Sequence, residues 1–311
     1  MNSKVKPERA LWIDRAKAYG IMLVVIGHVS PIAALHHPIY IFHMPLFFLL
    51  SGMTFKPFEG RSDVIKRSRS LLLPYLSFGI LIALVLAVAN QAMMQDVPIP
   101  GPLHFLLGGT FLTGAFGIFW FPPCLLATLL LLDRILRFTR RWQIATVVLI
   151  ALAAVWLSTM VEYNPWGLIT VGMALPFAYA GYTFGTSASF GTGKALIWLA
   201  GLLFLFAVLQ SYTGPVDYKY LRFGDLPQSV LLAFTGSAII CILSLAPMPW
   251  LDRVGTASLT IMYIHLPVYY LLQSWLSWPW IIVLAVAGGT LLHLALARWS
   301  PTRKWLLGRP A

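Results

Sequence analysis

Four of the seven histidines stand inside long apolar runs of the sequence, where an ionisable side chain is costly. They are His28, His43, His265 and His293. Ionisable residues at membrane depth are rare and usually serve a function. An imidazole titrates near neutral pH, so it can remove a proton from a hydroxyl group or act as a nucleophile. The alternative for each of them is a neutral ring that donates a hydrogen bond to a neighbouring helix.

A basic residue lies eleven positions before the first of these histidines. On a helix, Lys17 and His28 would project from one face, about 16 Å apart along the axis. Asp14 precedes Lys17 by three residues and could pair with it across one turn. A cation at one end and an imidazole at the other suit an extended ligand such as an acyl-CoA, with its phosphates at one end and its thioester at the other. Alternatively, Lys17 only snorkels to the membrane edge.

Two later segments also combine polar groups with apolar surroundings. Pro45 follows His43 by two residues and should open the helix, so that carbonyl groups and the imidazole face a cavity. A kinked helix with His43 bonded to a neighbour is the alternative. Lys66, Arg67 and Arg69 stand within four positions and would bind phosphate groups well. They would equally suit an ordinary cytoplasmic loop.

The elements that carry these residues are expected to be membrane helices. Of the 311 residues, 59% are hydrophobic and 10% are charged, and the mean hydropathy is +0.79. Soluble domains have about 45–50% apolar and about 25% charged residues. This composition excludes a disordered chain, a nucleic-acid-binding domain and a disulfide-stapled secreted domain. The net charge of +12 is therefore assigned to cytoplasmic loops near anionic lipid, with no nucleic-acid partner.

The sequence predicts an all-α, polytopic transmembrane helical bundle of about ten spans. The expected spans are 18–35, 39–55, 71–94, 118–132, 143–160, 168–186, 195–212, 229–246, 257–274 and 280–297. With cytoplasmic N- and C-termini, all but two of the 22 Lys and Arg residues fall on the cytoplasmic side, the exceptions being Lys219 and Arg222 in the 213–228 loop. Residues 1–311 are expected to form a single membrane-embedded domain, with a cytoplasmic segment 1–17 and a cytoplasmic tail 298–311. Cys124 and Cys241 are expected to be buried rather than bridged.

Three motifs resemble those of the acyltransferase-3 family of integral membrane acyltransferases, in the branch that is similar to fucose 4-O-acetylase and exopolysaccharide acetyltransferases. The family's first-helix motif, a basic residue, ten spacers and a histidine, reads here from Lys17 to His28, with lysine where arginine is common. The run FHMPLFFxxSG matches from Phe42 to Gly52, and a basic stretch leading into LLxPY matches from Lys66 to Tyr75. Weaker similarities are Phe119–Phe121 and Ile261–His265.

The resemblance implies a membrane O-acyltransferase, in the first place an O-acetyltransferase. Such an enzyme moves an acyl group from cytoplasmic acyl-CoA to a hydroxyl of a cell-surface or exopolysaccharide sugar or its lipid-linked precursor. It implies a multi-pass protein of the bacterial plasma (inner) membrane. The expected partners are an acyl-CoA donor, a glycan or lipid-linked oligosaccharide acceptor and membrane lipid. Acetyl-CoA or another acyl-CoA would be a co-substrate, with no permanently bound cofactor and no metal site.

The resemblance also implies that His28 is catalytic and that the early basic residues bind the donor. His28 would either deprotonate the acceptor hydroxyl or carry the acyl group briefly, and the sequence leaves both open. His43 and His265 are candidate oxyanion donors or orienting groups for His28. The residues expected at the donor are Asp14, which would hold Lys17, and the cations Lys17, Lys66, Arg67 and Arg69.

Two other classes of function remain as alternatives, a secondary transporter or flippase of a lipid-linked sugar and a non-catalytic membrane scaffold. A transporter is expected to have carboxylates in the middle of its spans and paired interrupted helices in two halves. No Asp or Glu lies in the middle of an expected span. A scaffold does not need a histidine and a cation aligned on one helix face.

Overall fold

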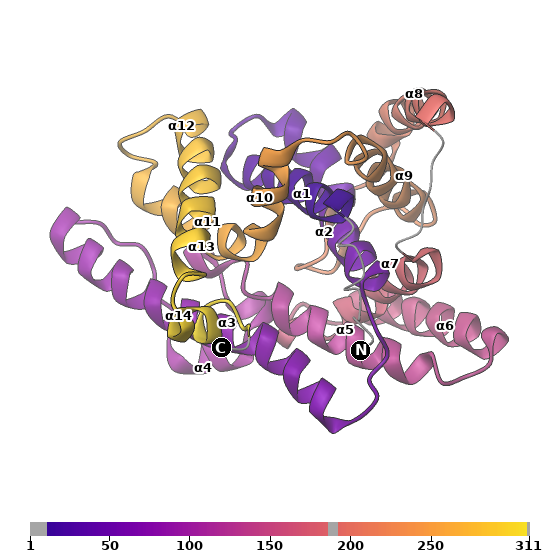
Figure 1. Ribbon diagram of the computed structural model, residues 1–311, viewed down its shortest axis with the longest axis horizontal. Helices are drawn as coiled ribbons and strands as arrows, with labels where there is room; N and C mark the ends of the chain where they lie inside the picture. The colour runs from indigo at the N-terminus through magenta and orange to yellow at the C-terminus, as the bar shows by residue number, and fades with distance from the viewer. Residues whose placement is uncertain (1–10, 186–191, 310–311) are drawn as a thin grey trace, which may run out of the picture.

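Most of the described chain is helical. The computed structural model describes residues 11–185 and 192–309, and within them the chain is helical apart from loops and one short β-hairpin (Figure 1). In chain order the helices are α1 (Leu11–Val29), α2 (Ala33–Met53), α3 (Arg61–Met93), α4 (Pro102–Leu107), η1 (Gly109–Phe111), η2 (Gly114–Phe116), α5 (Phe121–Ile135), α6 (Arg140–Ser158), η3 (Pro165–Gly167), α7 (Thr170–Phe184), α8 (Thr192–Leu209), η4 (Gln210–Tyr212), α9 (Gln228–Leu243), α10 (Pro249–Thr256), α11 (Ser258–Leu272), α12 (Trp278–Val283), η5 (Leu284–Gly288, a π-helical turn), α13 (Gly289–Leu296) and α14 (Ser300–Trp305). The all-helical fold class is therefore confirmed.

Six helical stretches in the described part of the chain are long and apolar enough to cross a membrane. They are Ala33–Met53, Arg61–Met93, Gly114–Ile135, Arg140–Ser158, Pro165–Phe184 and Trp278–Leu296. Three further apolar helices are shorter, Ile197–Tyr212, Gln228–Leu243 and Ser258–Leu272. Each of the ten expected spans coincides with helical structure over much of its length, while the count of ten crossings and the side on which the termini lie stay predictions.

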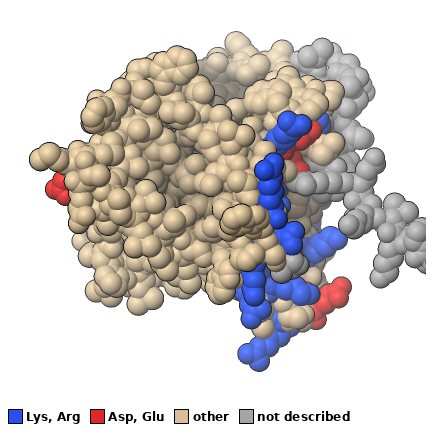
Figure 2. Space-filling model, turned by 60° about the vertical axis from the view of Figure 1, so that its left-hand side comes forward, with Lys and Arg blue, Asp and Glu red and all other residues tan. Residues whose placement is uncertain are grey.

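The outer helices present apolar side chains on their exposed surface. On α6, Trp142, Leu149 and Trp156 are each at least 60% exposed. Exposed apolar surface of this extent is unusual for a soluble monomer and normal for a helix in contact with lipid. In Figure 2 the lysine and arginine side chains of one face gather in a band, and the rest of that face is almost without charge. Both features agree with an integral membrane protein.

The core is built where α1 and α2 pack against helices from later in the chain. Helix α1 lies against α10 and α11, and α2 lies against α7 and α9. Glycines permit the closest of these contacts, because a side chain at Gly52 of α2 would overlap the Ala178 carbonyl of α7, and one at Gly181 would overlap the Leu49 carbonyl. Small residues that let two backbones approach are typical of helix packing in membranes.

A short hairpin inserts into one end of this bundle. Its strands are β1 (Val216–Asp217) and β2 (Arg222–Phe223), paired antiparallel with Val216 opposite Phe223. The side chains of Val216 and Phe223 are buried, so the hairpin packs against the helices rather than standing in solvent. It belongs to the 213–228 loop that was expected outside the cytoplasmic face.

Several sequence-based expectations fall partly outside the described residues. Of the N-terminal segment 1–17 the structure describes residues 11–17, and of the tail 298–311 it describes residues 298–309. The expected span 168–186 extends one residue beyond the described part. Cys124 and Cys241 are free and buried, as predicted.

Candidate active site

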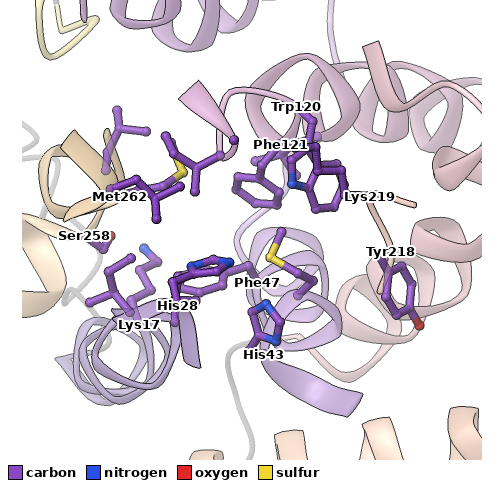
Figure 3. Close-up of a pocket in the computed structure, with 18 of the residues that line it drawn as sticks. Lys17, His28, His43, Phe47, Trp120, Phe121, Tyr218, Lys219, Ser258 and Met262 are labelled. Carbon is purple, nitrogen blue, oxygen red and sulfur yellow. The ribbon is translucent and has the colours of Figure 1, made fainter. Parts of the chain in front are cut away.

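A cavity of about 440 Å³ lies among α1, α2, α5, α11 and the hairpin. Helical periodicity explains which side chains α1 contributes to it. Lys17, Ile21, Val24 and His28 all line the cavity, and their spacing of four, three and four residues defines one helix face. The predicted shared face of Lys17 and His28 is therefore confirmed, and Figure 3 shows both side chains at the cavity.

Three histidines from three helices meet beside this cavity. His28 and His43 line it, and His265 is fully buried next to His28. The planes of the His28 and His265 rings are within 23° of parallel and the rings meet edge to edge, with their centroids 5.2 Å apart and Nδ1 of His28 3.0 Å from Nε2 of His265. The His43 ring is nearly perpendicular to that of His28, with the centroids 6.2 Å apart. The Tyr40 ring lies edge-on to both His28 and His43.

The hydrogen bonds of His265 determine which nitrogen of His28 is basic. Nδ1 of His265 lies 2.7 Å from the Met262 carbonyl and 3.2 Å from the Ile261 carbonyl. Carbonyl oxygens only accept, so this nitrogen carries the proton, and in the neutral ring Nε2 is an acceptor. Nδ1 of His28 must then donate to it, which leaves Nε2 of His28 with a free lone pair. Since Nδ1 points to His265, it is the Nε2 edge of the ring that remains for the cavity.

His43 has a similar arrangement. Its Nδ1 donates to the Ile39 carbonyl at 2.9 Å, within α2. In the neutral ring its Nε2 therefore carries no hydrogen. Neutral His43 and neutral His265 thus have no N–H to offer an oxyanion in the cavity, and of the two roles considered for them the geometry favours orientation. Pro45 does not interrupt the helix, because α2 continues from Ala33 to Met53 through it.

The end of the cavity at the start of α1 is charged. The Nζ atom of Lys17 lies 3.6 Å from Oδ1 of Asp14, the predicted ion pair across one turn. Helix α10 approaches closely here, because a side chain at Gly255 would overlap the Asp14 carbonyl. Arg15 points elsewhere, and its Nε donates to the Ser244 carbonyl at 2.7 Å. Lys17 is thus the cation that α1 presents to this cavity.

The three cations of the predicted phosphate cluster do not line the histidine cavity. Lys66, Arg67 and Arg69 line a second cavity of about 990 Å³, between the 54–59 loop, the first turns of α3 and the C-terminal segment. Further cations around it are Lys56, Lys304 and Arg309. Nε of Arg67 is buried and has no hydrogen-bond partner within the described chain. Because Arg309 lines both cavities, it marks where they adjoin.

The structure adds a lysine that sequence reasoning did not place at the site. Lys219 extends from the hairpin into the histidine cavity, is 8% exposed, and donates from Nζ to the Leu112 carbonyl at 2.5 Å. Burial lowers the pKa of Lys219 to about 8, although the charge of Asp217 opposes the shift. Burial raises the pKa of the Asp217 carboxyl. The available signal was that Lys219 is one of the two cations, with Arg222, that the sequence places outside the expected cytoplasmic loops.

No metal site is formed in the described part of the chain, where His, Cys, Asp and Glu side chains are nowhere grouped in threes that could hold an ion. A family model described as an acyltransferase domain matches residues 10–298. No curated protein and no solved structure was found to match the chain.

Proposed function

The chain belongs to this acyltransferase family, and from that premise we propose that it is an O-acyltransferase that moves an acyl group, acetyl in the first place, from acyl-CoA to a sugar hydroxyl. The observation that carries the proposal is the hydrogen-bonded pair of His28 and His265, because it leaves Nε2 of His28 as a base at the cavity. A charged group at the other end of the same cavity, Lys17, supports an extended donor with an anionic end.

His28 acts as the base in the simplest form of the reaction. Its Nε2 accepts the proton of the acceptor hydroxyl as that oxygen attacks the carbonyl carbon of the thioester. The tetrahedral intermediate then collapses, the carbon–sulfur bond breaks, and the thiolate takes the proton from the imidazolium. In the alternative, Nε2 itself attacks the carbonyl carbon, and the carbon–sulfur bond breaks to release the CoA thiolate. The acceptor hydroxyl then displaces Nε2 from the acyl group, and the hydroxyl proton passes to the thiolate. In both, the bond from Nδ1 of His28 to His265 keeps the ring in the productive orientation.

The donor would lie across the two adjoining cavities. Its phosphates would bind the cations of the larger cavity, among them Arg67 and Arg69, because a guanidinium matches the oxygens of a phosphate group. The pantetheine chain would pass Arg309 and Lys17 and bring the thioester to His28. Asp14 would hold Lys17 in place through their ion pair.

The acceptor is proposed to be a sugar of a cell-surface polysaccharide or its lipid-linked precursor, in a bacterial plasma membrane. This follows from the similarity of the Phe42–Gly52 and Lys66–Tyr75 motifs to the fucose 4-O-acetylase-like branch. The chain is proposed to work within the membrane with both termini on the cytoplasmic side, where acyl-CoA is available.

The proposal is tested by acyl transfer with matched histidine variants. Membranes containing wild-type protein, His28→Ala or His293→Ala are supplied with acetyl-CoA labelled in the acetyl group, and label in glycan and glycolipid is counted. His293 is the control because it is a buried histidine that bonds Thr260 at 2.9 Å and is not among the residues that line the histidine cavity. We expect His28→Ala to abolish incorporation and His293→Ala to retain it. Normal incorporation by a well-expressed His28→Ala protein would refute the proposal.

A further inference from the structure

One end of the histidine cavity has no role in the chemistry described so far. It is formed by four consecutive residues at the tip of the hairpin, Asp217, Tyr218, Lys219 and Tyr220, together with Tyr270 of α11. In Figure 3, Tyr218 and Lys219 lie across His28 from Lys17 and Ser258. A donor that enters past Lys17 therefore reaches His28 from one side and leaves this end of the cavity open to a second substrate.

The hairpin tip has a fixed geometry. The Thr170 hydroxyl of α7 donates to the Tyr218 carbonyl at 2.6 Å, and the Tyr218 side chain is 4% exposed. Oδ1 of Asp217 accepts hydrogen bonds from the backbone N–H of Lys219 at 3.0 Å and of Tyr220 at 3.4 Å. A binding surface that is ordered before the ligand arrives loses less entropy on binding. The tip is therefore suited to recognise a ligand rather than to move as a flexible loop.

The polar groups at this end suit a neutral ligand with several hydroxyls. The Lys219 ammonium uses one of its three N–H donors on the Leu112 carbonyl, and within the described chain the other two remain for a ligand. The Asp217 carboxylate has acceptor positions beyond its backbone bonds. Hydroxyl groups both donate and accept, so one ligand can satisfy both side chains. The opposite charges balance, in contrast to the larger cavity, where cations predominate and an anion is favoured.

Aromatic faces complete this end of the cavity. Tyr220 is 45% exposed, and the Lys219 Nζ lies 4.9 Å from the centroid of its ring. Tyr270 lies near the end of α11 and is half-buried. The apolar C–H face of a sugar ring can pack on an aromatic face while its hydroxyls reach the polar groups beside it. Few polar groups at fixed positions beside aromatic side chains are the usual composition of a specific small-molecule site.

We propose that the hairpin tip, Asp217 to Tyr220, forms with Tyr270 the acceptor subsite, and that it binds a neutral sugar ring with one hydroxyl directed at Nε2 of His28. Lys219 and Asp217 fix the neighbouring hydroxyls, and Tyr220 packs on the ring. The inference rests on the proposed acyltransferase function and names the part of the chain that selects the acceptor.

The test separates acceptor binding from donor chemistry. Purified protein in lipid nanodiscs is given acetyl-CoA together with one acceptor. The acceptor is methyl fucoside, another neutral methyl hexoside or, as the anionic comparison, methyl glucuronide. Free CoA and acetylated sugar are both measured. The variants are Tyr220→Ala, Asp217→Asn and Tyr220→Phe, which keeps the ring. Arg222→Lys is the matched control, because Arg222 is exposed on the same hairpin and lysine keeps the positive charge that acts on the Asp217 carboxyl.

We expect Tyr220→Ala and Asp217→Asn to raise the KM for the neutral sugar at least about tenfold, with less than about a twofold change in the KM for acetyl-CoA. That factor corresponds to the loss of about 1.4 kcal/mol of binding. Arg222→Lys should resemble the wild type, and Tyr220→Phe, which keeps the aromatic face, should recover most of the affinity that Tyr220→Ala loses. Sugar KM values that are unchanged in Tyr220→Ala and Asp217→Asn would overturn the inference, as would a wild type that releases CoA but acetylates none of the neutral sugars. A wild type that neither releases CoA nor acetylates sugar would instead refute the proposed function.

Discussion

Replacing His265 with leucine is expected to slow acyl transfer while leaving donor binding intact. His265 is fully buried, and it is not among the described residues that line the cavity, whereas His28 and His43 are. Any effect of His265 on the reaction rate must therefore pass through His28. The 3.0 Å bond between the two rings holds the proton of His28 on Nδ1 and the lone pair on Nε2. Leucine removes the acceptor, and the His28 ring is then free to turn or to carry its proton on the wrong nitrogen.

The size of the effect follows from the bond that is lost. Leaving a buried N–H without an acceptor costs about 1–3 kcal/mol. If this cost falls on the orientation of the His28 ring in which Nε2 faces the substrate, that orientation becomes less populated and kcat falls roughly 5- to 150-fold, since about 1.4 kcal/mol corresponds to a factor of ten in rate. The KM for acetyl-CoA should change little, because the proposed phosphate-binding cations lie in the other cavity.

The assay compares His265→Leu with two other variants in the acetyl-transfer reaction. His265→Gln offers an amide oxygen to Nδ1 of His28 and should recover part of the lost kcat. His293→Leu removes another buried histidine, whose partner is Thr260, and should keep kcat near the wild-type value. A His265→Leu enzyme with wild-type kcat would refute the reasoning, and so would a glutamine variant no faster than the leucine variant.

Three further results are expected. The Lys219 side chain has a pKa of about 8, so it is charged below that pH and neutral above it. The KM for a sugar acceptor, measured over a pH series, should therefore rise above pH 8. The Lys219→Arg variant stays charged and should show a smaller rise. Alanine at Arg67 or Arg69 should raise the KM for acetyl-CoA several-fold in initial-rate measurements, and an unchanged KM would assign these cations to topology alone. Gly181→Ala should overlap the Leu49 carbonyl and destabilise the α2–α7 contact by about 1–3 kcal/mol, seen as a lower Tm in thermal unfolding, and an unchanged Tm would contradict the close packing.

The face of α1 could be predicted because one helix determines it. The period of 3.6 residues brings Lys17 and His28 to the same side, and the i, i+3 spacing brings Asp14 to Lys17. The contact between His28 and His265 could not be obtained in this way. It joins residues 237 positions apart and depends on how α1 packs against α11. Likewise the tautomer of His28 becomes clear only once the carbonyl partners of His265 are known.

The cations show a second limit of sequence reasoning. Lys66, Arg67 and Arg69 were expected to join Lys17 at one donor site, but their spacing on α3 contains no information on where α3 begins relative to α1. The structure places them around an adjoining cavity that the C-terminal segment helps to form. From the sequence, Lys219 could be placed only in a loop. The hairpin that carries it has strands of two residues, which are too short to show a periodic pattern from which its packing against the helices could be predicted.

The most direct test of the account is a structure of the protein with a CoA analogue whose thioester is replaced by a ketone that cannot transfer its acyl group. We expect the ketone carbon to lie within about 3.5 Å of Nε2 of His28, a distance suited to reaction, with Nδ1 of His28 bonded to His265. The phosphates should lie among the cations around Arg67 and Arg69. An analogue bound with its ketone outside the histidine cavity, or a His28 ring with Nε2 turned to His265, would contradict it.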